Sequence, residues 1–117
     1  VSDFSQHPFP EYLRLGVPVA LATDDRGMWD STMTDEYFVA VKSFNLSWDE
    51  LRLLTQNSIQ YSFLGPEPKS RLLNAVDTRL LAFEKYWQTQ DPKQIGALKR
   101  SPKRGFICRN YDLCERD

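Results

Sequence analysis

Two neighbouring carboxylates, Asp24 and Asp25, are the side chains of this sequence best placed to do chemistry. They follow a short apolar run, residues 17–22, that ends abruptly at Thr23. α/β barrels and doubly wound sheets place their active sites at the C-terminal ends of such strands. Because adjacent strand residues point to opposite sides, the two carboxylates would have different roles. One would bind a metal while its neighbour turned toward a substrate.

The same pair also has a purely structural interpretation. An aspartate at this place would serve equally as a helix N-cap or in an Asx turn, with Gly27 supplying the bend in the loop. On spacing alone, both interpretations stay open.

Histidine and cysteine are too few for a metal site built from this chain alone. His7 is the only histidine, and its place before a proline at a helix start indicates a local structural residue. Cys108 and Cys114 would form a small disulfide loop in an oxidising compartment and remain two free thiols in a reducing one. A structural zinc site needs four ligands at recognisable spacing. Any metal chemistry must therefore borrow ligands from elsewhere.

One strand followed by helices would position the carboxylates. The almost uninterrupted apolar run 17–22 is typical of a parallel strand buried on both faces. Unpaired backbone groups in an apolar interior cost about 1–3 kcal/mol each, so the partner strands must lie outside this chain. The spacing of apolar residues predicts four helices. The first opens at His7–Pro10 and is capped by Gly16, and the second begins near Thr34. The third follows a capping box at Ser47–Glu50 and continues toward Gly65, and the fourth runs from Pro66 through Gln90.

Composition and charge limit the class of partner. The chain has 117 residues, 41% of them hydrophobic, and a formal charge of −1, which excludes wholesale disorder and a global basic field for nucleic acid or an anionic membrane. The longest apolar run, seven residues from Gly16 to Ala22, is too short to span a bilayer, and no signal peptide is visible. Because the first residue is Val1 rather than Met, we expect a processed chain or a fragment.

The C-terminal residues 91–117 differ in character from the rest. Lysine and arginine outnumber acidic residues there, and few apolar residues interrupt them. We interpret this segment as a solvated, flexible tail or a loosely packed extension. A nucleic-acid contact ranks below that, because the aromatic interleaving of single-strand binders is missing.

Taken in order, the landmarks of the sequence resemble the adenosine deaminase family of metal-dependent hydrolases. The run Val17–Ala22 ending in Thr23-Asp24-Asp25 looks like the last barrel strand of that family. The supporting landmarks are His7-Pro8 before it, Glu36-Tyr37 after it, and the run Asn57–Leu64 further on. The Asn-Ser-Ile-x-Tyr-Ser pattern is especially similar to the branch of adenosine deaminase-related growth factors. The resemblance covers about Asp3 to Trp87.

The resemblance implies an α/β fold, the C-terminal portion of a (β/α)8 TIM barrel, in which this chain is mostly α with one short parallel strand. Residues 1–90 would be the C-terminal part of the deaminase barrel and residues 91–117 the basic tail. Such barrels run to about 250 residues, so the rest of the barrel would be needed to complete the site.

The resemblance also implies the roles of the two carboxylates. Asp24 would be a catalytic residue that ligates the zinc ion and contacts its bound water. Asp25 would bind the substrate by a hydrogen bond to a purine ring nitrogen, which requires a proton on the carboxyl or on that nitrogen. Crowding beside Asp24 and burial would both raise the pKa of Asp25. Arg26 stands where many relatives carry proline.

The implied reaction is zinc-dependent hydrolytic deamination of adenosine to inosine and ammonia. The remaining zinc ligands, a histidine near the attacking water and a glutamate proton donor would lie outside this chain. The parent protein would then be a purine nucleoside deaminase, and this chain would be inactive alone. The alternative is a non-catalytic helical binding or structural module descended from a deaminase. Localisation stays open between the cytoplasm and a secreted or periplasmic compartment; a bridge between Cys108 and Cys114 would suit the secreted relatives.

Overall fold

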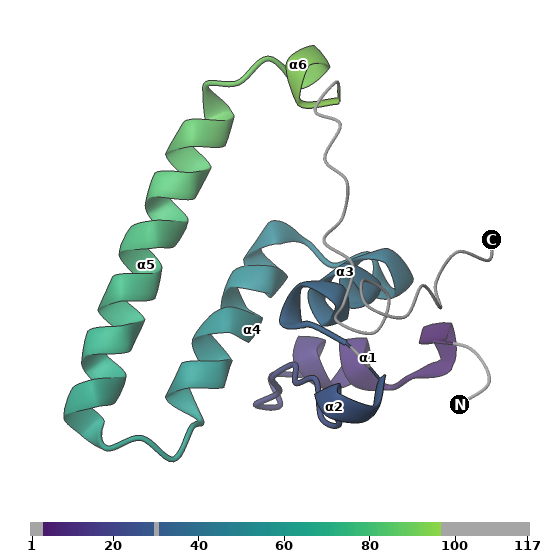
Figure 1. Cartoon of the computed structure of the whole chain (residues 1–117), viewed down its shortest axis with the longest axis vertical. Coiled ribbons are helices and arrows are strands. Elements are labelled where there is room, and N and C mark those ends of the chain that lie inside the picture. The colour runs from purple at the N-terminus through teal and green to yellow at the C-terminus, as the bar shows by residue number, and fades with distance from the viewer. Residues whose placement is uncertain (1–3, 30, 97–117) are drawn as a thin grey trace.

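The computed structural model describes residues 4–29 and 31–96. Within these ranges the elements are η1 (Phe4–Gln6), α1 (Phe9–Arg14), α2 (Arg26–Trp29), α3 (Met33–Phe44), α4 (Trp48–Gln60), α5 (Pro66–Gln88) and α6 (Pro92–Gly96). Helices α4 and α5 run antiparallel and side by side, and α1, α2 and α3 gather on the other side of α4 (Figure 1). The candidate carboxylates lie in the connection between α1 and α2.

Paired caps fix the starts of the two middle helices. The predicted capping box before α4 is confirmed: the Glu50 N–H donates to Ser47 Oγ at 3.1 Å, and the Ser47 N–H donates to Glu50 Oε1 at 3.1 Å. Helix α3 begins at Met33, one residue before the predicted start, because Thr32 and Asp35 form a second box of the same kind.

The helix ends follow the local backbone chemistry. Gly16 follows α1 with a φ of 81°, the left-handed conformation expected of a glycine after a helix. Helix α5 begins at Pro66 as predicted and ends at Gln88, two residues before the predicted end. Helix α4 ends at Gln60, so the prediction that its stripe continues toward Gly65 was too long.

The predicted strand at 17–22 is not formed in the described chain. The described residues contain no strand, and this segment runs between α1 and α2 without a ladder partner. A strand is defined by hydrogen bonds to a neighbouring strand, and the apolar pattern cannot supply that neighbour. Side chains of the segment nevertheless alternate between packed and exposed positions, as they would in a strand. Val19 and Leu21 pack against the core, whereas Pro18, Ala20 and Ala22 are exposed.

The buried core of the described chain is small. It consists of Phe9, Leu13, Ala40, Leu46 and Leu54, of which Leu54 has 0% of its surface exposed. Large apolar side chains remain open to solvent on several elements, including Leu15 at 79% exposure and Met28 at 69%. The 23-residue helix α5 has no buried residue. The helices therefore leave many large apolar side chains uncovered.

The C-terminal prediction falls mostly outside the described residues. Helix α6 begins the segment predicted as a basic tail, and residues 97–117, with Cys108 and Cys114, lie beyond the described part. The division at residue 90 stays a prediction. Of the helices that are described, not one combines the length and the apolar character needed to cross a membrane.

Candidate functional site

Asp24 and Asp25 lie at a bend between the extended segment and α2, and both side chains are exposed. Asp24 has a φ of 50°, the left-handed region that a residue with a side chain enters at a cost of about 1 kcal/mol or more. Aspartate tolerates this conformation better than most residues. Asn45 has the same φ of 50° where it ends α3, so the left-handed conformation marks a turn of the chain at both residues.

The structural interpretation of the pair accounts for the backbone but not for the side chains. The Asp25 carbonyl accepts the Met28 N–H at 2.9 Å, which starts α2. Within the described chain, neither carboxylate makes a hydrogen bond or an ion pair. Gly27 lies inside α2 without a positive φ, so the bend is made at Asp24 rather than at the glycine. Both carboxylates are free to accept external groups.

Side chains of the extended segment alternate between half-buried and exposed up to the bend that carries Asp24. Val19, Leu21 and Thr23 are half-buried against the helices. Ala20 and Ala22 are exposed in alternation with them, because successive residues of an extended chain point to opposite sides. The alternation ends at the bend, where Asp24 and Asp25 are both exposed. The open face is thus lined by small side chains and leads to the two carboxylates.

Asn57 ties this segment to α4. Its side-chain Nδ2 donates to the Val19 carbonyl at 2.9 Å, and the residue is buried, with 8% of its surface exposed. Between residues 18 and 23, this is the one hydrogen bond to the backbone from another element in the described chain. Because a carbonyl only accepts, the amide must present its NH₂ group to it.

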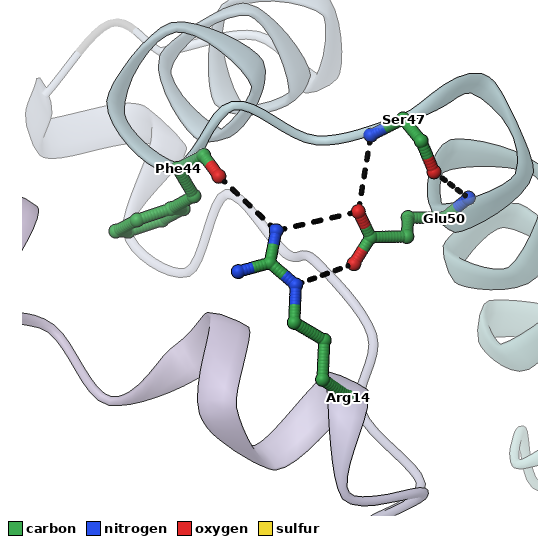
Figure 2. Close-up of polar contacts among 4 residues, drawn as sticks. All are labelled: Arg14, Phe44, Ser47 and Glu50. Carbon is green, nitrogen blue, oxygen red and sulfur yellow. Dashed lines mark hydrogen bonds and ion pairs between the residues drawn. The ribbon is translucent and has the colours of Figure 1, made fainter.

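An arginine holds the start of the same segment (Figure 2). Arg14 Nε donates to Glu50 Oε2 at 3.0 Å, and Nη2 donates to Glu50 Oε1 and to the Phe44 carbonyl, both at 3.3 Å. The hydrogen bonds from Arg14, with the backbone N–H of Ser47, hold the pKa of Glu50 below its usual value. The end of α1, the end of α3 and the cap of α4 are thereby joined at one guanidinium, two residues before Gly16.

The other landmarks of the sequence have structural places. His7 accepts the Phe9 N–H on Nδ1 at 3.1 Å and lies 6.3 Å from the Phe44 ring, as expected of a structural histidine. Tyr37 joins α3 to α4 through a hydrogen bond of its hydroxyl to Thr55 Oγ1 at 3.3 Å. Arg26 begins α2, the first helical position at which proline is also well tolerated.

The described residues do not by themselves make a metal site. Among them, no three His, Cys, Asp or Glu residues are grouped closely enough to hold a metal ion. Asp24 offers one carboxylate, an oxygen ligand that zinc accepts, and His7 is turned to its own helix start. The donor type therefore fits zinc, and the described residues supply one ligand of the set.

Sequence reasoning named Asn57 as the start of a landmark run but missed its contact with the segment, and it missed the contacts by which Arg14 joins α1 to α3 and α4. A signal for Asn57 was present, because an asparagine on the buried side of a helix must find a hydrogen-bond partner. Asn57 lies three residues after Leu54, on the face of α4 that meets the core. No comparable signal marked Arg14, whose partners lie 30 and 36 residues away.

Comparison with known proteins finds a family and several relatives that match this sequence. The family model described as adenosine deaminase matches residues 1–79. The chain is 32% identical over 81 residues to an adenosine deaminase of Enterococcus faecalis, covering 69% of this chain and 24% of that protein. It is 34% identical over 83 residues to an aminodeoxyfutalosine deaminase of Streptomyces coelicolor, covering 71% of this chain and 21% of that protein.

A similar match is found to an adenosine deaminase of Clostridium acetobutylicum, at 35% identity over 77 residues, or 66% of this chain and 23% of that protein. No solved structure matches the chain significantly. The chain spans between a fifth and a quarter of the length of these curated relatives. Since the family model covers residues 1–79, well over half of the sequence, the chain belongs to the adenosine deaminase family.

Proposed function

We propose that this chain is the C-terminal piece of a zinc-dependent purine nucleoside deaminase, which converts adenosine and water to inosine and ammonia. The observation that carries the proposal is the placement of Asp24. Its carboxylate is exposed, lacks a partner in the described chain, and ends the open face of the extended segment. A position at the C-terminal end of a barrel strand is where (β/α)8 enzymes keep catalytic groups.

The extended segment supports a barrel that other segments complete. Its backbone from 18 to 23 receives one hydrogen bond from elsewhere in the described chain, so both of its edges can pair with neighbouring strands. Burying its N–H and C=O groups without such pairing would be costly. With strands on both sides, the Ala20 and Ala22 face would line the barrel interior and the helices would stay outside.

The two carboxylates would divide the chemistry. Asp24 would hold the zinc ion through a carboxylate oxygen and thereby fix the ion at the end of the segment. Zinc, when bound, lowers the pKa of a coordinated water to about 7 and so supplies a nucleophile at neutral pH.

Asp25 would bind a purine ring nitrogen, which can only accept, so this contact needs a proton on the carboxyl or on the ring. The burial expected around Asp25 is absent from the described chain, where the side chain is exposed. The remaining barrel and the substrate would have to provide it. Specificity for adenosine over other aminopurines therefore depends on residues outside this chain, and an aminodeoxyfutalosine deaminase is among the relatives.

The alternative is a non-catalytic helical module. It requires that the chain alone buries its apolar faces, and the exposure of Leu15 and Met28, together with the lack of a buried residue in α5, counts against this. A cooperative unfolding transition of the isolated 117-residue chain would support the module instead.

The test uses the full-length protein that carries this sequence. Asp24→Asn should lower bound zinc and reduce ammonia release from adenosine by several orders of magnitude, because an amide replaces a charged ligand. Asp49→Asn is the matched control, since Asp49 is an exposed aspartate in the first turn of α4 and should leave both unchanged. Aminodeoxyfutalosine is assayed in parallel to settle the substrate. Full zinc content and full activity in Asp24→Asn would refute the ligand assignment.

A further inference from the structure

The amide of Asn57 is an unusual feature of the helical layer. It is the buried polar side chain among the described residues, and its NH₂ group donates a hydrogen bond to a backbone carbonyl 38 residues away. A polar group placed inside an apolar core is costly unless a partner satisfies it. The partner in this case is Val19, in the segment that ends at Asp24.

A hydrogen bond to one chosen carbonyl fixes register. The apolar residues of the segment, from Val17 to Ala22, are small or branched, and a shift by one residue would still leave apolar side chains against the helices. Such a shift moves the chain by about 3.3 Å and turns every side chain to the opposite face. Apolar packing alone therefore discriminates weakly between the two registers. The Asn57–Val19 bond discriminates strongly, because a slip by one residue turns the facing carbonyl away and leaves the buried amide unpaired.

We propose that Asn57 is a positioning residue for the deaminase site: it sets the register of the extended segment and so fixes where along the segment the bend that carries Asp24 begins. The inference rests on the proposed function, since it assigns Asn57 an effect on zinc binding at Asp24. Asn57 itself touches neither metal nor substrate. It acts through five residues of backbone, as an outer-shell group acts on a metal ligand.

Helix α4 offers a matched control at the preceding position. Gln56 donates its Nε2 to Asp77 Oδ1 at 2.8 Å and so joins α4 to α5 rather than to the extended segment. Asn57→Asp and Gln56→Glu each replace one donating amide by a carboxylate of the same shape. Both variants should weaken the contacts of α4 and lower the thermal midpoint of the full-length protein. Only Asn57→Asp presents an acceptor to the Val19 carbonyl.

The experiment measures zinc affinity by chelator competition, together with kcat and KM for adenosine, in the full-length protein and both variants. Outer-shell changes cost roughly 10–100-fold in metal affinity or activity, so Asn57→Asp should weaken zinc binding about tenfold or more while Gln56→Glu stays within about twofold. Equal zinc affinity in the two variants, or wild-type affinity in a folded Asn57→Asp protein, would overturn the inference.

Two further outcomes keep the tests separate. If Asn57→Asp does not fold, Asn57→Ser serves in its place, because serine adds no charge and is too short to reach the carbonyl in the same way. Its zinc affinity is then held to the same tenfold criterion. A wild-type protein that neither binds zinc nor deaminates adenosine refutes the proposed function and the inference with it. Wild-type deamination with zinc binding insensitive to Asn57 refutes the inference alone.

Discussion

The guanidinium of Arg14 provides a quantitative test of how the helical layer is held together. It donates to both carboxylate oxygens of Glu50 and to the Phe44 carbonyl, at 3.0 to 3.3 Å. Arg14 is half exposed and Glu50 is 22% exposed, so their attraction is that of a surface ion pair, about 0.2–1 kcal/mol. The bond to Phe44 adds about 0.5–1.5 kcal/mol. Arg14→Met should therefore destabilise this layer by about 1–2 kcal/mol while keeping most of the apolar stem.

A double-mutant cycle isolates the ion pair. Glu50→Gln keeps a side chain able to complete the capping box with Ser47 and removes the charge. We expect a coupling free energy of about 0.2–1 kcal/mol between Arg14→Met and Glu50→Gln, measured by hydrogen exchange of the first turn of α4 in the full-length protein. Zero coupling would show that the carboxylate serves the cap alone.

The pH dependence gives an independent check on the same contact. The pKa of Glu50 is lowered in the folded chain, so its stabilisation is fully present above the unfolded value near 4.3 and is lost as the pH falls through the lower folded value. Arg14→Met should reduce this loss of stability at low pH, because it removes the Arg14 hydrogen bonds that contribute most to the lowered pKa of Glu50. If Arg14→Met loses as much stability at low pH as the wild type, the assignment of the lowered Glu50 pKa to Arg14 is refuted.

Two further predictions concern the core and the start of α3. Leu54→Ala should destabilise the full-length protein by about 2–5 kcal/mol in denaturant unfolding, because Leu54 has 0% exposure and the change leaves a cavity. A loss below about 1 kcal/mol would mean that the surrounding core collapses to fill the cavity. Asp35→Asn should abolish a loss of α3 protection as the pH falls, because hydrogen bonds from the Thr32 side chain and backbone lower the pKa of Asp35. Their stabilisation is fully present above the unfolded value near 3.9 and is lost as the pH falls through the lower folded value. An identical acid response in wild type and variant, by hydrogen exchange of residues 33–38, would contradict this.

The sequence predicted the elements whose signals are local. The Ser47–Glu50 box, the glycine after α1 and the proline start of α5 depend on neighbouring residues alone, and all three are found. The short α2 was not predicted, because four residues of it carry too little periodicity. The strand prediction failed for a different reason. Its pattern reports burial on two faces, whereas a strand also needs ladder partners, which the described chain does not supply.

The position of the candidate site stays a prediction, and its geometry could not be derived from the sequence. Apolar residues ending in two carboxylates indicated Asp24 and Asp25 before any coordinates. The left-handed backbone of Asp24 and the contact of Asn57 with Val19 could not be derived in this way, because each depends on residues far away in the sequence or on a single backbone angle. The roles in zinc and purine binding came from the family resemblance and stay predictions.

The missing strand and the open carboxylates have one physical origin. Helices satisfy their own backbone groups, so the helical layer of this chain can form around Leu54 with few long-range contacts. A strand cannot do so, and the segment before Asp24 is accordingly the part whose structure depends most on other segments. A carboxylate at its end is therefore presented, but not enclosed, by the helices alone. Enclosure excludes water and strengthens every charge interaction at a site, so catalysis at Asp24 would belong to the assembled barrel. In the inference proposed above, the contribution of α4 would be to set the register of the segment through Asn57.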